Sequence, residues 1–303
     1  MTTLVFGHKS PDTDSTGSPI IWAWYLNEIG IPAKPVLLGE PNTEAAFVLK
    51  HWGLDKPAII QDVTADDKVV IVDTNNPAEL PPSVNEAKIQ AIIDHHMLVG
   101  GIKTKTPIDI TIRPLACTAT IMHDLMGDTL AQAPKGIKGA MLSCILSDTL
   151  EFRSPTTTPH DRAVAEKLAA DLRVSIPELA TKMFEAKSDV SAFSDAELLR
   201  MDSKEYNVEG KELRVSVLET TAPKIVLDRK ASLMRAMEGV AKEDGADQVL
   251  LFVVDILKEE ATLLVPNDLV KQLAEASFGA KVTGDTVVLP GIMSRKKQII
   301  PAL

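Results

Sequence analysis

The chain has 303 residues, of which 45% are hydrophobic, 24% are charged and only 4% are aromatic. This length favours two domains, and the composition is typical of a globular protein with a largely aliphatic core. The formal net charge of −10 argues against a general affinity for nucleic acid or for an anionic membrane, since both require a basic surface.

The N-terminal residues lack the basic segment and long apolar run of a signal peptide. No stretch reaches the roughly 20 apolar residues that span a bilayer. Cys117 and Cys144 fit no disulfide framework or zinc pattern, so we expect two buried free thiols. We therefore expect a cytoplasmic protein that binds neither membranes nor nucleic acid.

The first 115 residues alternate short β-rich runs with helical stretches. The predicted strands are Thr3–Phe6, Pro35–Leu38, Ala58–Ile60, Val69–Val72, Ile89–Ile93 and Ile108–Ile112, and the predicted helices are Pro19–Ile29 and Thr43–Trp52. Continuous apolar runs suit strands that are buried on both faces of a parallel sheet. The pattern predicts an α/β fold with a doubly wound, mainly parallel N-terminal sheet and helices on both of its faces.

The rest of the chain is predicted to be helical first and then to form a smaller α/β domain. Residues 117–187 are predicted to be mostly helical, with breaks at Pro134, Pro155, Pro159 and Pro177. The small polar stretch Lys187–Ser194 suggests domains at 1–188 and 194–303 joined by a hinge linker, 189–193. The second domain is predicted to contain a hairpin at Glu209-Gly210, a long helix after Pro223, the strands Gln248–Leu257 and Thr262–Val265, a further helix, and the strand Thr286–Leu289.

Acidic and histidine side chains follow several of these elements. GHKSPDTDS follows the first strand and carries His8, Asp12 and Asp14; Asp73 ends Val69–Val72, Asp94-His95-His96 ends Ile89–Ile93, and Asp148 ends a helix-like stretch. Each group alone has an ordinary explanation, such as a helix cap, a solvated loop or a chance pair. Ligand sites of open α/β sheets lie outside the carboxyl ends of the strands, so we expect these side chains to converge on one metal site.

The types of ligand indicate the metal and the chemistry. Carboxylates and imidazoles without thiolate suit manganese, cobalt, iron or zinc, and manganese is favoured where carboxylates dominate. The set exceeds what one ion needs, so bridging carboxylates could hold two ions about 3.5–4 Å apart, as in hydrolytic two-metal sites. Neither a GxSxG nucleophile elbow nor a Walker A sequence is present. The sequence therefore predicts a metal-dependent phosphohydrolase.

A basic segment stands out near the end of this acidic chain. Met293–Gln298 reads MSRKKQ, and the turn Pro290-Gly291 before it and Ile299-Ile300 after it indicate an ordered segment. Arginine and lysine pair with phosphate oxygens, arginine in bidentate fashion. Lys204 is weaker evidence, because an isolated lysine is most often plain surface.

With GHKSPDTDS, Asp73, Asp94-His95-His96 and SRKKQ all in order, the chain resembles the family II inorganic pyrophosphatases of the DHH phosphoesterase superfamily. The resemblance covers essentially the whole chain and implies a DHH catalytic domain followed by a DHHA2-type substrate-binding domain. Related exonucleases and phosphodiesterases carry a glycine-rich GGGH-type motif in the second domain, and this sequence has none.

The resemblance also implies roles for individual residues. One metal would be held by His8, Asp12, Asp73 and Asp148, and the other by Asp14, Asp73, His95 and Asp148. Asp94 would orient the histidines, and His96, Lys204, Arg295 and Lys296 would bind pyrophosphate. Asp12 and His96 would take part in catalysis.

The implied cofactors are two Mn(II) or Co(II) ions, with Mg(II) on the substrate. The implied reaction is hydrolysis of pyrophosphate to two orthophosphates by a metal-bridging hydroxide, in an active site between the two domains of a homodimer. The alternatives are a short-chain polyphosphate or nucleotidyl phosphoesterase on the same scaffold, and a catalytically silent metal- or nucleotide-binding regulator.

Overall fold

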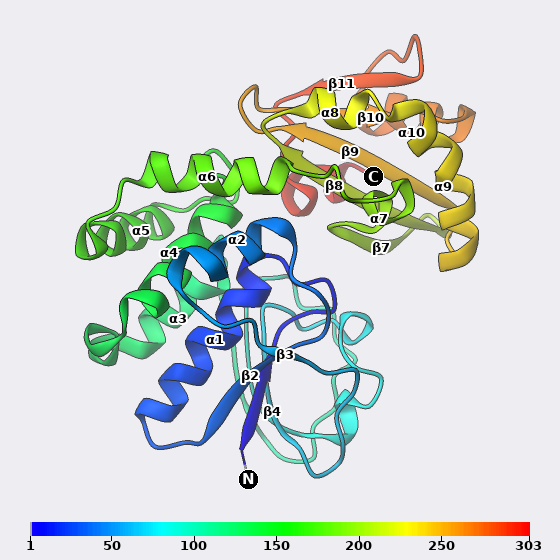
Figure 1. Ribbon diagram of the computed structural model, residues 1–303. Helices are drawn as coiled ribbons and strands as arrows, with labels where there is room; N and C mark the ends of the chain where they lie inside the picture. The colour runs from blue at the N-terminus through cyan, green and yellow to red at the C-terminus, as the bar shows by residue number, and fades with distance from the viewer. Residues whose placement is uncertain (1) are drawn as a thin grey trace. The chain divides into compact units, whose positions relative to one another are not determined.

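The computed structural model describes residues 2–303 and divides into two compact units, each with its own β-sheet (Figure 1). One unit runs to Met183 and the other comprises Phe184–Leu303, so the division falls within helix α6 (Ile176–Ser188). The domain limits at 188 and 194 and the linker 189–193 stay predictions.

The sheet of the first unit is parallel throughout and its strand order reverses beside β1. Its strands are β1 (Thr3–Phe6), β2 (Ala33–Leu37), β3 (Ala58–Ile59), β4 (Lys68–Val72), β5 (Lys88–Asp94) and β6 (Asp109–Ile112), in the order β3-β2-β1-β4-β5-β6. The chain moves outward from β1 through β2 to β3, and then from β4 through β5 to β6 on the other side. The carboxyl ends of β1, β4 and β5 therefore lie side by side at the point where ligands bind in such sheets.

Helices and short connections cover this sheet. The helices are α1 (Thr13–Glu28), α2 (Thr43–Trp52), α3 (Thr118–Met126), α4 (Lys135–Thr149) and α5 (Pro159–Leu172). Of these, α1 packs on β1 and β2, α3 packs on β5, and α4 packs on α1 and α2 (Figure 1). Leu4 and Phe6 share one face of β1 and pack with Leu80 and Val84, near the short 3₁₀ helices η1 (Pro77–Glu79) and η2 (Val84–Glu86). The predicted α/β class is confirmed.

Capping explains where the helix boundaries differ from the sequence prediction. The first helix begins at Thr13 rather than at Pro19, because the Asp12 side chain caps it by accepting a hydrogen bond from the Ser15 amide at 2.9 Å. Pro19 therefore lies inside the helix. Pro159 occupies the first turn of α5, where its missing N–H is no loss. The long helix expected after Pro223 is two helices, α8 (Pro223–Leu227) and α9 (Lys230–Asp244).

The second unit has a mixed five-stranded sheet. Its strands are β7 (Ser203–Val208), β8 (Lys211–Thr220), β9 (Gln248–Asp255), β10 (Glu260–Leu264) and β11 (Thr286–Pro290), in the order β11-β10-β9-β8-β7, and β8 and β9 pair in parallel. The remaining elements are α7 (Asp195–Arg200), α10 (Asp268–Phe278), the π-helical turn η4 (Arg295–Ile299) and α11 (Ile300–Ala302). The expected hairpin is confirmed: Glu209 and Gly210 connect β7 and β8, both at positive φ.

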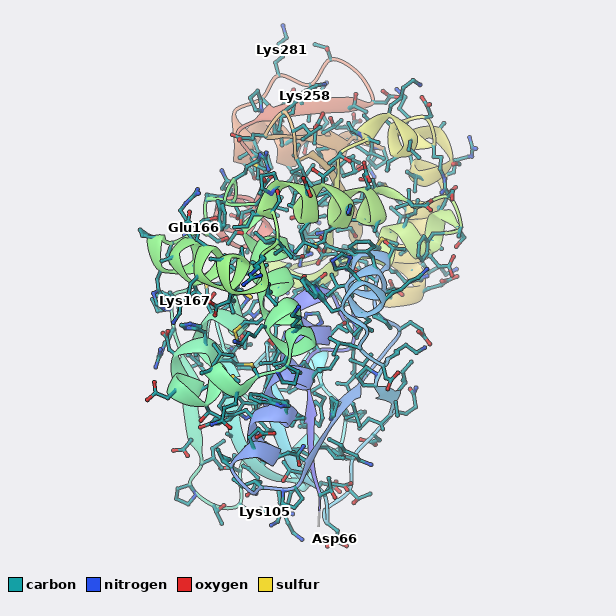
Figure 2. All side chains as sticks on the ribbon, turned by 60° about the vertical axis from the view of Figure 1, so that its left-hand side comes forward. Asp66, Lys105, Glu166, Lys167, Lys258 and Lys281 are labelled. Atoms are coloured by element: carbon teal, nitrogen blue, oxygen red, sulfur yellow. The ribbon has the colours of Figure 1, made fainter. Side chains whose placement is uncertain are left out.

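The surface is charged and well solvated. Figure 2 labels six exposed charged side chains that project outward from the two units: Asp66, Lys105, Glu166, Lys167, Lys258 and Lys281. Among residues 2–303, no helix combines the length and apolar character needed to cross a membrane.

The packing of α4 on α2 makes a prediction about two helical glycines. A Cβ at Gly139 in α4 would lie 2.1–2.4 Å from ring atoms of Trp52, whereas a Cβ at Gly239 in α9 would meet nothing within 4 Å. Gly139→Ala should lower the free energy of unfolding by about 1–3 kcal/mol through overpacking. Gly239→Ala should raise it by about 0.5–1 kcal/mol, since alanine is the better helix former. Urea unfolding of both variants measures this, and a Gly139→Ala variant as stable as the wild type would contradict the packing.

Candidate metal centre

Asp73 lies at the middle of the site, directly after β4 and between two imidazoles from neighbouring strand ends. Its Oδ2 is 3.6 Å from Nε2 of His8, which follows β1, and its Oδ1 is 3.4 Å from Nε2 of His95, which follows β5. Its backbone is left-handed, with φ of 59°, and its amide donates to the Ile93 carbonyl at 2.9 Å. Non-glycine residues in this region cluster at functional sites, because the fold must hold them there.

The loop GHKSPDTDS brings His8 and Asp12 to Asp73. A Cβ at Gly7 would lie 2.1 Å from Oγ of Ser15, so only glycine fits there. The His8 amide donates to the same Ser15 Oγ at 2.8 Å, which closes the loop onto α1. Asp12 Oδ1 caps α1 while its Oδ2 lies 3.6 Å from Nε2 of His8. Capping and facing the site are therefore compatible roles for one carboxylate.

Asp14 is buried in the first turn of α1 and is held from two sides. Ser18 donates its hydroxyl to Asp14 Oδ1 at 2.6 Å, and the Thr118 amide donates to Oδ2 at 2.7 Å. The Thr118 hydroxyl also donates to Asp73 Oδ1 at 3.2 Å. Thr118, which sequence reasoning missed, thus links two of the predicted ligands through one residue at the start of α3.

Asp148 supplies an oxygen that has no hydrogen-bond partner. It stands in the last turn of α4, and its Oδ2 is buried without such a partner among residues 2–303. His95 Nε2 lies 3.9 Å from this oxygen. An unsatisfied buried polar atom costs about 1–3 kcal/mol, and more when the group is charged. A cation that Asp148 could coordinate would remove this cost.

The electrostatics of the cluster also call for a cation. Burial raises the pKa of Asp73 well above its ordinary value, and the negative charges of Asp14 and Asp12 raise it further. The pKa of Asp148 is raised by burial and by the charges of Asp14, Asp12 and Asp73. Carboxylates this close disfavour one another's ionised forms unless positive charge lies between them. The residues present therefore fit divalent metal ions.

Asp94, at the end of β5, organises the two histidines that follow it. Burial alone would raise the pKa of Asp94, but the hydrogen bond and charge of His96 and the charge of His95 hold it well below its ordinary value. Its Oδ1 accepts from both histidine amides, at 2.7 and 3.0 Å. Its Oδ2 accepts from Asn75 Nδ2 at 2.5 Å, a buried partner that sequence reasoning missed although it is only two residues past Asp73.

The two histidines differ in what their Nδ1 atoms contact. His95 Nδ1 lies 3.1 Å from the Leu115 carbonyl, which can only accept, so this nitrogen donates and leaves the Nε2 lone pair facing Asp73. His96 Nδ1 lies 2.8 Å from Asp94 Oδ1. The His95 side chain is 9% exposed and that of His96 28%. His95 is therefore the more deeply buried of the two imidazoles, and His96 the more accessible.

Three groups of ligand atoms, two of which share Asp73, lie close enough to hold metal ions, each with all atoms within 4.8 Å of one another. They are Asp73, His95 and His96; His8, Asp12 and Asp73; and Asp14, Cys117 and Asp148. All six predicted metal ligands fall in these groups. Cys117 and Cys144 are buried free thiols, as expected, but the position of Cys117 beside Asp14 and Asp148 was not foreseen. Burial raises the pKa of Cys117, which favours the neutral thiol.

The predicted phosphate-binding cations lie in the second unit. Arg295 donates from both terminal nitrogens to Asp202, and its contact with Asp202 Oδ1 is 2.7 Å. Lys204 is two residues further on, in β7. The basic turn is ordered because Gln298 Oε1 accepts from the amides of Met293 and Ser294, each at 2.9 Å. Arg295 is therefore held beside the start of β7.

Comparison with known proteins first defines the class. The model of the DHH family N-terminal domain matches residues 2–148, and the DHHA2 domain model matches residues 181–303. The chain is thus a two-domain protein of the DHH–DHHA2 type, with the sheet order and strand-end residues described above.

Relatives over the full length define the family. Proteins named as probable manganese-dependent inorganic pyrophosphatases are 39% identical in Deinococcus radiodurans and 34% in Lactobacillus helveticus, covering 99% of this chain and 96% and 97% of theirs. A crystal structure from Methanococcus jannaschii, described as a family II inorganic pyrophosphatase, matches with a TM-score of 0.86 at 34% identity, covering 99% of this chain and 98% of that one. The chain belongs to the family II, manganese-dependent inorganic pyrophosphatases.

A pH dependence follows from the raised pKa values of Asp73 and Asp148. A raised folded-state pKa contributes stability that is complete below the ordinary value of 3.8 and is lost as pH rises through the raised value. Metal-free protein should therefore melt at higher temperature as pH falls from 8 to 5, by about 2–4 °C for each kcal/mol regained. Because the pKa of Asp94 is lowered, its protonation destabilises the folded protein only at pH values below this range of 8 to 5.

Calorimetry in EDTA measures this trend, and Asp73→Asn is the variant to compare. The substitution removes one titrating carboxyl, so its melting temperature should change less with pH than that of the wild type. A wild-type melting temperature that fell steadily between pH 8 and 5 would contradict the assigned electrostatics.

Proposed function

We propose that this protein hydrolyses pyrophosphate to two orthophosphates with bound manganese. The observation that carries the proposal is the cluster of four aspartates and two histidines around Asp73, in which His8, Asp14 and Asp73 are buried and one oxygen of Asp148 has no hydrogen-bond partner in the described part of the chain. Membership of the pyrophosphatase family supplies the substrate.

We assign the ligands to two ions. The set for the first would be His8, Asp12, Asp73 and Asp148, and the set for the second Asp14, Asp73, His95 and Asp148. The two oxygens of Asp73 support a shared role, since Oδ2 faces His8 and Oδ1 faces His95. Oxygen and nitrogen ligands of this kind suit manganese and also cobalt, and magnesium would accompany the substrate.

Two residues are proposed to move or hold protons. Ions bound in this centre supply polarisation of phosphoryl oxygens and acidification of a water molecule. Asp12 Oδ2, on the side of the carboxylate that does not cap α1, would orient that water or accept its proton. His96, whose Nδ1 contacts Asp94, would donate a proton from Nε2 to the substrate or its leaving oxygen. Asp94 would keep this ring in one orientation.

The second unit is proposed to bind the phosphate groups. Arg295, Lys296 and Lys204 would neutralise charge on the substrate, and the bonds from Arg295 to Asp202 favour a fixed position for the guanidinium. An active site between the domains, a homodimer and a cytoplasmic location remain predictions.

Substrate preference tests the proposal directly. Phosphate release with manganese should be fastest from pyrophosphate, and much slower from tripolyphosphate and from short oligonucleotides, because the assigned cations suit a small phosphoanhydride. Initial rates for the three substrates at equal metal concentration measure this. A faster rate on either comparison substrate would assign the protein to the alternative phosphoesterase function instead.

The proposal assigns metal binding and phosphate binding to different residues, and this separation gives a second prediction. Arg295→Ala with Lys296→Ala should lower kcat/KM by about 100-fold or more, chiefly through KM, since phosphate charge loses its partners. Manganese affinity, measured by calorimetry, should stay within about twofold, because the assigned metal ligands all belong to the first unit whereas Arg295 and Lys296 belong to the second. The matched control is Arg235→Ala with Lys281→Ala, which removes the same charges from exposed positions. A collapse of manganese binding in the first variant would refute this separation.

A further inference from the structure

Glu44 is a fully buried carboxylate in the first turn of α2, and no part of the assigned reaction uses it. Its Oε2 accepts two hydroxyl hydrogen bonds, from Thr13 at 2.8 Å and from Ser147 at 2.6 Å. Both bonds are buried, and they join positions 31 and 103 residues from Glu44 in the sequence.

The two donors adjoin the assigned metal ligands. Thr13 stands between Asp12 and Asp14, and Ser147 immediately precedes Asp148. One oxygen of Glu44 therefore connects the N-terminal turn of α1 with the C-terminal turn of α4. These two helix ends carry three of the six ligands, and packing of α1 on α4 alone would leave the rotation of each terminal turn less defined.

The segment that carries Glu44 is itself docked on the ligand-bearing loop. The Asn42 amide donates to the Pro11 carbonyl at 3.0 Å. A Cβ at Gly39 would lie 2.4 Å from the Lys9 carbonyl oxygen, so the backbones approach closely at that point. The connection from β2 to α2 thus contacts GHKSPDTDS at Lys9 and Pro11, and Glu44 in α2 adds the contact to Thr13.

A carboxylate at position 44 is not the residue that would give the folded protein the greatest stability. Burying an ionisable group near Asp12, Asp14 and Asp148 is unfavourable, and apolar residues of similar size often stabilise such positions better. A carboxylate oxygen, however, accepts two short hydroxyl bonds at once, and these are stronger than neutral ones. Partners beyond the ligands themselves commonly orient metal sites in this way.

We propose that Glu44 is a positioning residue of the metal centre: through Thr13 and Ser147 it fixes the spacing of Asp12 and Asp14 relative to Asp148. The inference rests on the metal-binding part of the proposed function. It concerns how tightly the centre binds manganese, and it assigns no contact between Glu44 and the substrate.

Manganese titration by calorimetry, without pyrophosphate, tests the proposal. Glu44→Ala should weaken manganese binding by about tenfold or more. Glu44→Gln, which keeps an acceptor oxygen for the hydroxyls, should restore most of that affinity. The double variant Thr13→Val, Ser147→Ala, which removes both donors, should reproduce the loss. The matched control is Ser143→Ala. Ser143 is, like Ser147, a buried serine of α4 that bonds to α2, since it accepts from Trp52 Nε1 at 3.0 Å. Unlike Ser147, it adjoins no assigned metal ligand. Its manganese affinity should equal that of the wild type.

Melting temperatures in EDTA separate positioning from general destabilisation. If Glu44→Ala does not fold, the single variants Thr13→Val and Ser147→Ala decide, since each removes only one hydroxyl. The proposal is overturned if the folded variants bind manganese as tightly as the wild type, or if Ser143→Ala weakens binding equally. Wild-type protein that bound no manganese would refute the metal site itself, whereas tight binding without pyrophosphate hydrolysis would refute only the assigned reaction.

Discussion

Mutual repulsion of buried carboxylates is the constraint on which the rest of the structure depends. Asp12, Asp14, Asp73 and Asp148 come from three separate elements and face a common region in which burial and like charge raise the pKa values of Asp73 and Asp148. Packing alone would not keep such groups together, because each would gain by turning toward water. The first unit holds Asp12, Asp14 and Asp73 with dedicated hydrogen bonds, and divalent cations would relieve the repulsion that remains.

These hydrogen bonds come from residues with no reactive role of their own. Ser15 closes the first loop, Thr118 holds Asp14 and Asp73, and Asn75 holds Asp94. Thr118 thereby connects α3 with α1 and with the end of β4, and Asn75 connects the segment after β4 with the end of β5. A preformed centre of this kind loses little further entropy when it binds metal, which is how rigid elements give precise sites.

Local sequence patterns predicted the sheet and the strand-end residues well, because continuous apolar runs and the polar residues that end them are properties of a few consecutive positions. Thr43–Trp52 was predicted with both of its ends correct, since Asn42 caps it and Gly53 ends it. Glu44 and Thr118 were missed because their contacts lie 31 to 104 residues away, and no local period encodes such pairs. The start of α1 was misplaced because the helix was predicted from its apolar stretch, which begins at Pro19, although Asp12 caps it six residues earlier at Thr13.

His95 and His96 show how the fold gives different tasks to identical neighbours. The Leu115 carbonyl fixes His95 with a neutral acceptor, which leaves the Nε2 lone pair for a cation among the aspartates. Asp94 gives His96 an anionic hydrogen-bond partner at Nδ1, which holds that ring in place. The two rings lie 4.3 Å apart, edge to face, and His95 lies deeper than His96. A single backbone step past β5 therefore separates two imidazoles that differ in their Nδ1 partner and in their burial.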